Sequence, residues 1–381
     1  MKKKIFTSLG LMSGTSMDGV DLSIIRSDGF SEVEQLHDKY YEFDDNLQDE
    51  LINLRENLNT SEDLKKYSKK IKDIEKKFTL FNSKIVNEAA NQTGLKVDLI
   101  GFHGQTILHL AKKKISEQLG DGNLLSQLSK CLVVNNFRQN DLDNNGQGAP
   151  LTPIFHNLIT KKLNKSFNLK YPMDIINIGG ITNVSQIIKD GDVEQNVFAF
   201  DVAPGNCLID EWLRKNSNKK YDKNGEIANS GKVDKFIFNQ SVENFEINSI
   251  KESLDVKNFD LSFVKGLTLE NGCATLTKFT AYLISQGLKK IDQANNLVTK
   301  NYIVCGGGRK NKTLIKDINQ FMGREEMILD NIDEYQINGD FVESQAFAYL
   351  AIRSFLNLPI SFPNTTRCKK PSVGGVIIKN F

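Results

Sequence analysis

A glycine-rich turn that directly follows a short apolar run near the N-terminus constrains this chain most. The run is Ile5–Met12, and residues 9–21 read Leu-Gly-Leu-Met-Ser-Gly-Thr-Ser-Met-Asp-Gly-Val-Asp. Glycine lets a backbone approach an anion closely, because no Cβ keeps the N–H groups away from it. The hydroxyls of Ser13, Thr15 and Ser16 add donors that suit phosphate oxygens. The segment therefore predicts a phosphate-binding loop, with a plain glycine-rich hairpin turn as the structural alternative.

Two acidic residues in the same segment, Asp18 and Asp21, would repel phosphate directly. Beside a phosphate group, such carboxylates instead hold Mg²⁺ or the water molecules around it. We therefore expect Asp18 to bind Mg²⁺, directly or through water. The complete predicted nucleotide loop consists of Gly14, Thr15, Ser16, Met17, Asp18, Gly19, Val20 and Asp21.

Length and composition exclude several classes of function. With 381 residues the chain is long enough for two domains, and 49 basic against 47 acidic residues leave a net charge of +2, which carries no nucleic-acid or membrane signature. No apolar stretch approaches the roughly 20 residues of a membrane span. The five cysteines are odd in number and form no C-x-x-C pair, which indicates reduced thiols and no zinc site. We expect a cytoplasmic protein that binds neither nucleic acid nor membrane.

The predicted helices and strands follow one order twice. In the first half we predict strands at 5–12, 20–25, 33–43, 97–102 and 131–135, and helices at 46–58, 61–93 and 123–129. In the second half we predict strands at 174–178, 182–189, 197–200, 302–305 and 327–329, and helices at 206–215, 269–289, 312–322 and 340–356. Each half reads βββαβαβ, and each opens with a strand, a glycine turn and a hairpin.

Such a duplication predicts an α/β protein with a mixed sheet and helices on both faces in each half. The layout resembles the RNase H-like domains of the actin, hexokinase and Hsp70 superfamily, in which ATP binds in a cleft between two domains. We expect the first domain to consist of residues 1–130 and 362–381, and the second of residues 131–361.

A second anion-binding segment spans residues 200–206. Asp201 is expected to end a strand over the predicted cleft, where it would serve as the general base. Gly205 and Asn206 open a predicted helix, and the N-terminus of a helix favours anions. The structural alternative for Asp201 is an N-capping aspartate.

A third segment, Gly306, Gly307 and Gly308, follows a predicted strand and precedes a predicted helix. Such a junction lets a flat base or a ribose lie against the backbone. The chain has no G-x-x-x-x-G-K-[ST] motif and none of the H-R-D and D-F-G motifs of protein kinases. These two classes of phosphate-transferring enzyme are therefore excluded.

Polar side chains in two further segments suit a hydroxyl-rich sugar, and a glutamate in a predicted helix adds to them. The expected substrate-binding residues are His103, Gln105, Arg138, Asp141, Gln147 and Glu343. Arg138 could meet an anionic group such as a lactyl carboxylate. Glu343 lies in a first helical turn, where a glutamate that merely pairs with the helix dipole is an equal alternative.

Seven motifs in this order resemble the anhydro-N-acetylmuramic acid kinase family over nearly the whole chain. They are Gly10–Gly19, Phe102–Thr106, Gly146–Leu151, Asn177–Ile181, Asp201 with Pro204–Asn206, Val304–Gly308, and Glu343 with Ala346–Ala348. The resemblance implies a cytoplasmic, Mg²⁺- and ATP-dependent kinase of cell-wall recycling, commonly a homodimer. It would open 1,6-anhydro-N-acetylmuramic acid with water and phosphorylate O6, giving N-acetylmuramate 6-phosphate.

By the same resemblance, Asp201 matches the catalytic aspartate of the family and Gly14–Asp21 matches its ATP-binding segment. A kinase of another sugar on this fold and a non-catalytic ATP-binding switch protein are the alternatives. The second of these is disfavoured because the chain has no peptide-binding domain and its loops are rich in sugar-type side chains.

The chain departs from the family pattern at several positions. Val202-Ala203 replace Thr-Gly, Asn144-Asn145 stand where glycine is usual, 252–258 lack the usual Gly and Arg, and 364–367 lack small residues. We expect the missing threonine hydroxyl to remove a group close to the phosphates. The missing arginine would remove a substrate contact, so that substrate affinity or identity could change.

Overall fold

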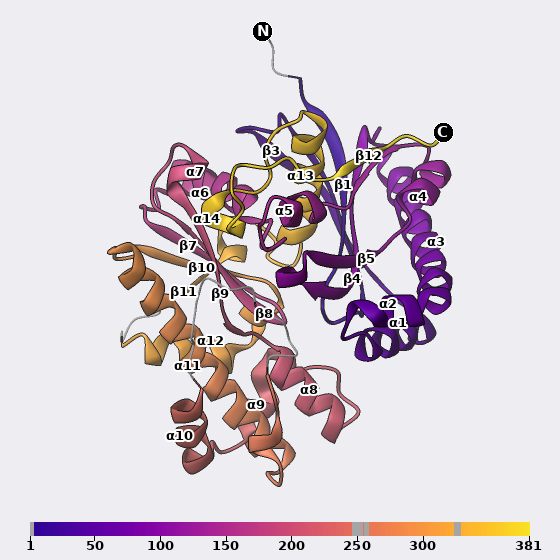
Figure 1. Ribbon diagram of the computed structural model, residues 1–381. Helices are drawn as coiled ribbons and strands as arrows, with labels where there is room; N and C mark the ends of the chain where they lie inside the picture. The colour runs from indigo at the N-terminus through magenta and orange to yellow at the C-terminus, as the bar shows by residue number, and fades with distance from the viewer. Residues whose placement is uncertain (1–3, 246–253, 255–258, 324–328) are drawn as a thin grey trace. The chain divides into compact units, whose positions relative to one another are not determined.

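The computed structural model describes residues 4–245, 254, 259–323 and 329–381 (Figure 1). Its internal contacts divide the chain into two compact units. Unit 1 consists of Met1–Ile159, Asp192–Gln195 and Phe341–Phe381, and unit 2 of Thr160–Gly191 and Asn196–Asp340. Among the described residues, no helix combines the length and apolar character that crossing a membrane requires.

Unit 1 is built on a mixed sheet whose strands follow the order β12-β6-β4-β1-β2-β3, with β5 paired to β4. The strands are β1 (Phe6–Ser13), β2 (Gly19–Ser27), β3 (Val33–Glu42), β4 (Leu99–Leu110), β5 (Ile115–Leu119), β6 (Leu132–Asn135) and β12 (Val376–Ile378). β1, β2 and β3 form an antiparallel meander, and β4 lies parallel to both β1 and β6. A meander followed by parallel strands is the predicted RNase H-like order.

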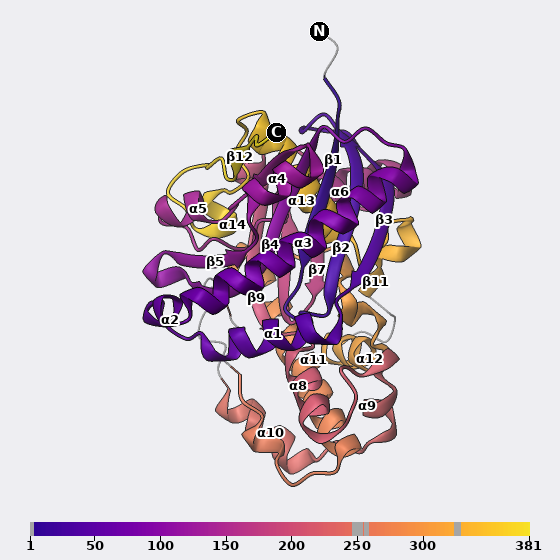
Figure 2. The same ribbon diagram turned by 90° about the vertical axis from the view of Figure 1, so that its right-hand side faces the viewer.

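Helices cover both faces of this sheet, as Figures 1 and 2 show. The helices of unit 1 are α1 (Asp45–Asn57), α2 (Ser61–Lys66), α3 (Ser68–Thr93), α4 (Gly122–Ser129), α5 (Gln139–Asp143), α13 (Val342–Phe355) and α14 (Pro363–Thr366), together with α6 (Pro153–Phe167) and α7 (Val193–Asn196), which extend into unit 2. The helix predicted at 61–93 is interrupted at Tyr67, and it ends as expected where Gly94 adopts a φ of 64°.

Helix α13 lies directly against the two central strands of unit 1. Gly10 on β1 and Gly101 on β4 are neighbours in the parallel register. A Cβ at Gly10 would lie 1.9 Å from the carbonyl oxygen of Ser344, and one at Gly101 would lie 2.2 Å from that of Phe347. Both carbonyls belong to α13, so only glycine permits this approach of helix to sheet.

We therefore expect Gly101→Ala to lower the free energy of unfolding by at least about 1–3 kcal/mol, the usual cost of overpacking. Urea denaturation of the variant and of the original chain measures the difference. Gly14→Ala is the matched control, because a Cβ at Gly14 meets nothing within 4 Å. Equal stability of Gly101→Ala and the original chain would contradict the packing described above.

Unit 2 repeats the strand order around a second sheet, β11-β10-β7-β8-β9. Its strands are β7 (Met173–Ile178), β8 (Ile181–Ile187), β9 (Val197–Pro204), β10 (Asn301–Cys305) and β11 (Leu329–Asn331). Its helices are α8 (Cys207–Asn216), α9 (Glu226–Ser230), α10 (Lys235–Asn244), α11 (Leu269–Asn295) and α12 (Lys312–Phe321). Again β7, β8 and β9 form an antiparallel meander, and β10 is parallel to β7 and β11.

The predicted duplication of an α/β fold is confirmed, whereas the domain boundaries differ from those expected. Residues 131–159 and 341–361 belong to unit 1. The reason is that β6 pairs with β4 and that α13 packs against β1 and β4, partners that lie far away in sequence. The strand predicted at 327–329 begins at Leu329, and Met327 lies outside the described residues. The cleft expected between the two domains stays a prediction.

Candidate functional site

The predicted nucleotide loop connects β1 to β2 and is anchored in the core of unit 1. The side chains of Met17 and Val20 are each 1% exposed, so these two residues pack inward. Met17 adopts a φ of 54°, and its amide donates to the carbonyl of Gly14 at 3.3 Å. Thr15 and Ser16 are exposed at the tip. The loop is thus a tight turn with a buried base and an open tip.

The side chain of Gln105, which we expected to bind the sugar, contacts this loop. It lies within β4, which continues to Leu110, and its side chain is buried. Its Oε1 lies 2.6 Å from the hydroxyl of Ser13, and its Nε2 donates to the carbonyl of Gly14 at 3.1 Å. Both ends of the amide therefore contact the residues at which β1 enters the turn. Our expectation that the strand ends near residue 102 was wrong.

Asp18 lies at the end of the turn, among other polar groups. The hydroxyl of Ser16 donates to Oδ1 of Asp18 at 2.5 Å. Burial, followed by the charges of Asp18, Glu42 and Asp21, raises the pKa of the Tyr40 hydroxyl. Within the part of the chain that the structure describes, no three His, Cys, Asp or Glu side chains are grouped so as to hold a metal ion.

His103 and Arg138 form a fixed pair on β4 and at the start of α5. Nδ1 of His103 lies 2.8 Å from the carbonyl oxygen of Gly104, which can only accept, so Nδ1 carries the proton. Nε2 then accepts from Nη2 of Arg138 at 2.9 Å, and Nη1 of Arg138 donates to the carbonyl of Gly148 at 2.6 Å. Burial, followed by the charge of Arg138, holds the pKa of His103 well below its usual value of 6.5.

Asp141 shapes the loop that carries Gln147. Its side chain is buried, and Oδ2 accepts from the amide of Gly148 at 2.7 Å while Oδ1 accepts from the hydroxyl of Thr366 at 2.6 Å. The amide of Gln147 donates to the carbonyl of Thr366 at 2.7 Å. The structure thus brings His103, Arg138, Asp141 and Gln147 into one connected network.

Two other predicted features of unit 1 are placed by the same structure. Glu343 is the second residue of α13 and is half-buried, a position that fits both a substrate contact and pairing with the helix dipole.

Asn145, which stands where glycine is usual, adopts a φ of 62°. Asparagine tolerates this left-handed conformation better than most residues do, so the loop keeps the backbone that glycine would give.

In unit 2 Asp201 lies within β9, which runs on to Pro204, so the prediction that it ends a strand was wrong. Its side chain is 6% exposed. Oδ1 accepts from the side-chain amide of Asn183, its register partner on β8, and Oδ2 accepts from the amide of Leu254 at 2.9 Å. Apart from Leu254, the divergent stretch 252–258 lies outside the described residues. These two N–H donors fix the orientation of the carboxylate.

Val202, which stands where the family has threonine, packs against helix α11. It is fully buried, and a Cβ added at Gly287 on α11 would lie 2.6 Å from its own Cβ. Its side chain therefore packs in the core of unit 2. Our expectation that this substitution removes a hydroxyl near the phosphates was wrong, because the side chain at this position contacts the helix behind the strand.

The amides of Gly205 and Asn206 bind the Gly179-Gly180 turn of the β7–β8 hairpin. Gly205 donates to the carbonyl of Gly180 at 2.8 Å, and Asn206 donates to that of Gly179 at 2.8 Å. The helix α8 begins one residue later, at Cys207. These two amides are thus engaged by the protein itself, so they are not available as donors to an anion.

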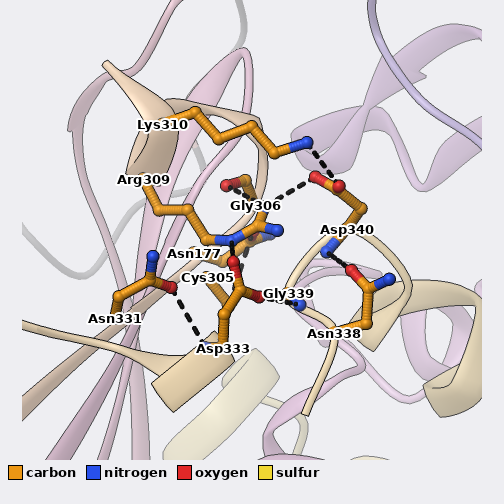
Figure 3. Close-up of polar contacts among 10 residues, drawn as sticks. All are labelled: Asn177, Cys305, Gly306, Arg309, Lys310, Asn331, Asp333, Asn338, Gly339 and Asp340. Atoms are coloured by element: carbon orange, nitrogen blue, oxygen red, sulfur yellow. Dashed lines mark hydrogen bonds and ion pairs between the residues drawn. The ribbon is translucent and has the colours of Figure 1, made fainter. Parts of the chain in front are cut away.

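The Gly306–Gly308 turn is held by a buried guanidinium that the sequence did not single out (Figure 3). The side chain of Arg309 is 2% exposed. Its Nη1 donates to the carbonyl of Gly306 at 3.1 Å and to Oδ1 of Asp340 at 2.5 Å, and its Nε donates to Oδ2 of Asp333 at 2.9 Å. Burial alone would raise the pKa of Asp340, but the bonds from Arg309 and Lys310 hold it below its usual value.

Within the turn, the three glycines have different surroundings. A Cβ at Gly308 would lie 2.2 Å from Cγ2 of Ile178, and Gly306 adopts a φ of 76°. Gly307, by contrast, is exposed, and a Cβ there would meet only the side-chain amide of Asn206, at 4.0 Å. Two glycines are therefore required by packing and conformation, and Gly307 presents open backbone. The position of Arg309 directly after three glycines is the signal that could have revealed its role.

Comparison with known proteins assigns a family to this arrangement. The family model described as "Anhydro-N-acetylmuramic acid kinase" matches residues 6–380. Proteins with that name include one from Pelagibacter ubique, which is 52% identical over 381 residues and all of both chains. Another, from Agrobacterium fabrum, is 34% identical over 383 residues and 99% of each chain. A glucokinase of the ROK family from Streptomyces griseus, solved with glucose and AMPPNP, is 11% identical with a TM-score of 0.40, over 91% of this chain and 99% of that chain.

The buried neutral His103 leads to a prediction on stability and pH. In the unfolded chain this imidazole takes up a proton near pH 6.5, whereas in the folded chain it stays neutral to a much lower pH. The unfolded state then binds more protons, so the free energy of unfolding falls as the pH drops below about 6.5, by up to about 1.4 kcal/mol per pH unit.

Replacing His103 with glutamine should flatten this dependence between pH 5 and 6.5, as measured by urea denaturation at several pH values. His156, whose pKa burial lowers to about 3, contributes equally in both proteins. The same slope in His103→Gln and the original chain would contradict the prediction.

Proposed function

The chain belongs to the anhydro-N-acetylmuramic acid kinase family and is thus a sugar kinase, and we propose that it opens 1,6-anhydro-N-acetylmuramic acid with water and phosphorylates O6. The product would be N-acetylmuramate 6-phosphate, with ATP as the phosphate donor. The observation that carries this proposal is the family match over residues 6–380, which includes every candidate site residue described above.

In this proposal Asp201 is the general base. Its carboxylate is oriented by Asn183 and Leu254, so that its oxygens have fixed positions. An anhydro sugar has no free O6, and therefore Asp201 has no sugar hydroxyl to deprotonate there. It would instead take a proton from water as the water attacks the anomeric carbon. The bridging oxygen leaves that carbon as O6, which then attacks the γ-phosphate.

The turn between β1 and β2 in unit 1 is proposed to bind the phosphates of the nucleotide, and the open backbone of Gly307 in unit 2 is proposed as a separate nucleotide contact. A Cβ at Gly14 would meet no atom within 4 Å, so this side of the loop has room for a phosphate group. Mg²⁺ is commonly bound by one or two carboxylates together with substrate phosphates. Asp18, at the end of the turn, fits that pattern, and the ion would neutralise the charge of the phosphates.

The sugar is proposed to bind the network of His103, Arg138, Asp141 and Gln147, with Glu343 as a further contact. Arg138 brings a positive charge to the loop that Gly148 and Gln147 form, which suits the lactyl carboxylate of the substrate. Asp141 acts on that loop through Gly148, so its part is to shape the surface.

Three further points complete the proposal by similarity to the family. They are a role in peptidoglycan recycling, a cytoplasmic location and a homodimeric state. Size-exclusion chromatography with light scattering would test the last of these.

We expect Asp201→Asn to lower turnover about 10²–10⁴-fold, the usual contribution of a general base, while ATP still binds. Turnover is measured as phosphate transfer to the anhydro sugar, and ATP binding by calorimetry. Asp292→Asn is a matched control, because Asp292 is another carboxylate of unit 2. It accepts hydrogen bonds from the hydroxyls of Thr299 and Tyr302, which are buried or partly buried residues outside the candidate site. Turnover of Asp201→Asn within threefold of the original chain would remove Asp201 from this role.

The source of the oxygen bound to the anomeric carbon of the product tests whether water opens the anhydro bond. If water opens the anhydro bond, a turnover in ¹⁸O-water should place one ¹⁸O at the anomeric carbon, detected by mass spectrometry. A kinase that phosphorylates an existing hydroxyl takes up no solvent oxygen.

Because a free hemiacetal exchanges slowly with water, unlabelled product placed in the same ¹⁸O-water serves as the control. Label that appears no faster than in this control would overturn the hydrolytic step. Phosphorylation of ordinary N-acetylmuramic acid but not of the anhydro form would favour a kinase of another sugar.

A further inference from the structure

We propose that Gln105 and Arg55 are positioning residues of the nucleotide loop, which turn two backbone amides of the loop toward a phosphate group of the nucleotide. This inference rests on the proposed function, because it takes the turn between β1 and β2 as the phosphate site. It goes further by naming the two amides, Thr15 and Ser16, and the side chains that orient them.

The first part of the argument is that two consecutive carbonyls of the loop are held by side chains. The Gly14 carbonyl accepts from Nε2 of Gln105 at 3.1 Å, and the Thr15 carbonyl accepts from Nη1 of Arg55 at 3.1 Å. Gln105 reaches the loop from β4, and Arg55 reaches it from the last turn of α1. Two side chains from separate elements thus hold neighbouring peptide groups.

The second part follows from peptide geometry. A trans peptide group is planar, and its N–H points away from its C=O. The Gly14 carbonyl shares its peptide group with the amide of Thr15, and the Thr15 carbonyl shares its own with the amide of Ser16. With both carbonyls directed at Gln105 and Arg55, these two N–H groups point away from those side chains.

The surroundings of the two amides agree with this role. Thr15 and Ser16 are exposed, and neither amide has a hydrogen-bond partner among the residues that the structure describes. The next amide, that of Met17, is already engaged by the Gly14 carbonyl. A pair of consecutive amides at an exposed tip is the kind of group that binds anions.

The two holding side chains are themselves fixed. Gln105 is 1% exposed, and its Oε1 lies 2.6 Å from the hydroxyl of Ser13, so its Nε2 is directed at the loop. Arg55 follows Leu51 and Leu54, which are fully buried in the core and hold α1 in place. A buried Gln105 acts on a ligand only through the loop, which distinguishes this role from direct contact with the sugar.

The test compares the binding of ADP and of adenosine, which differ in their phosphate groups. In Gln105→Leu and in Arg55→Met we expect calorimetry to show ADP binding weakened about fivefold to tenfold, the effect of losing about one hydrogen bond. Adenosine binding should stay within twofold. In steady-state assays the KM for ATP should rise and the KM for the sugar should stay within twofold. Arg55→Lys, which keeps a charged donor, should recover part of the loss.

Matched controls show whether the weakened ADP binding is specific to Gln105 and Arg55 or follows from any change to these strands and helices. Gln118→Leu alters a half-buried glutamine on β5, next to β4, and Lys77→Met removes an exposed cation that pairs with Glu50 of α1. Both controls should bind ADP as the original chain does. Urea denaturation shows whether Gln105→Leu is folded. Arg55→Met, which alters a half-buried residue of α1, tests the same loop independently.

The outcomes distinguish this inference from the proposed function. Three results would overturn the positioning role. They are an equal loss of affinity for ADP and for adenosine, unchanged ADP binding in both variants, and a KM raised for the sugar alone in Gln105→Leu. If the original chain binds ADP no more tightly than adenosine, the loop is not a phosphate site, and the proposed nucleotide site fails together with this inference.

Discussion

Close contact between backbone segments, which only glycine permits, underlies the architecture of both units. In unit 1 it lets α13 lie on β1 and β4 at Gly10 and Gly101. In unit 2 a Cβ at Gly205 would lie 2.1 Å from the carbonyl of Gly179, and one at Gly308 would collide with Ile178. Because a Cβ at any of these positions would push two elements apart, the strand ends and turns that carry the candidate site depend on these contacts.

This constraint explains why much of the fold could be predicted from the sequence. The glycine turns follow apolar runs, and the runs are strands: Ile5–Met12 corresponds to β1 and Asp174–Ile178 to β7. Local patterns of this kind decide where strands and helices form. Domain boundaries depend on pairing between distant segments, such as β6 with β4, which no local pattern records. They accordingly differed most from our expectation.

The sequence indicated that several candidate residues lie together, but it did not indicate their contacts. His103, Arg138 and Asp141 do lie together, as the chemistry of their side chains indicated. Their hydrogen bonds, however, could not be deduced from residue type, because a polar side chain in a motif can contact either a ligand or the backbone of its own protein. The amide of Asn206 illustrates the point, because it already donates a hydrogen bond to the carbonyl of Gly179. An N–H group near the start of a helix can bind an anion only if it has no such partner.

Several polar side chains at the candidate site form hydrogen bonds to backbone groups of the protein. Asp141 binds the amide of Gly148, Gln105 binds the carbonyl of Gly14, and Arg309 binds the carbonyl of Gly306. Each of these backbone groups belongs to a glycine, the residue whose conformation is least restricted and most in need of an external partner. In such an arrangement the loop backbone is left to meet the ligand, and the side chains fix its direction. A motif of glycines and polar residues can therefore specify a site even where few of its side chains touch the substrate.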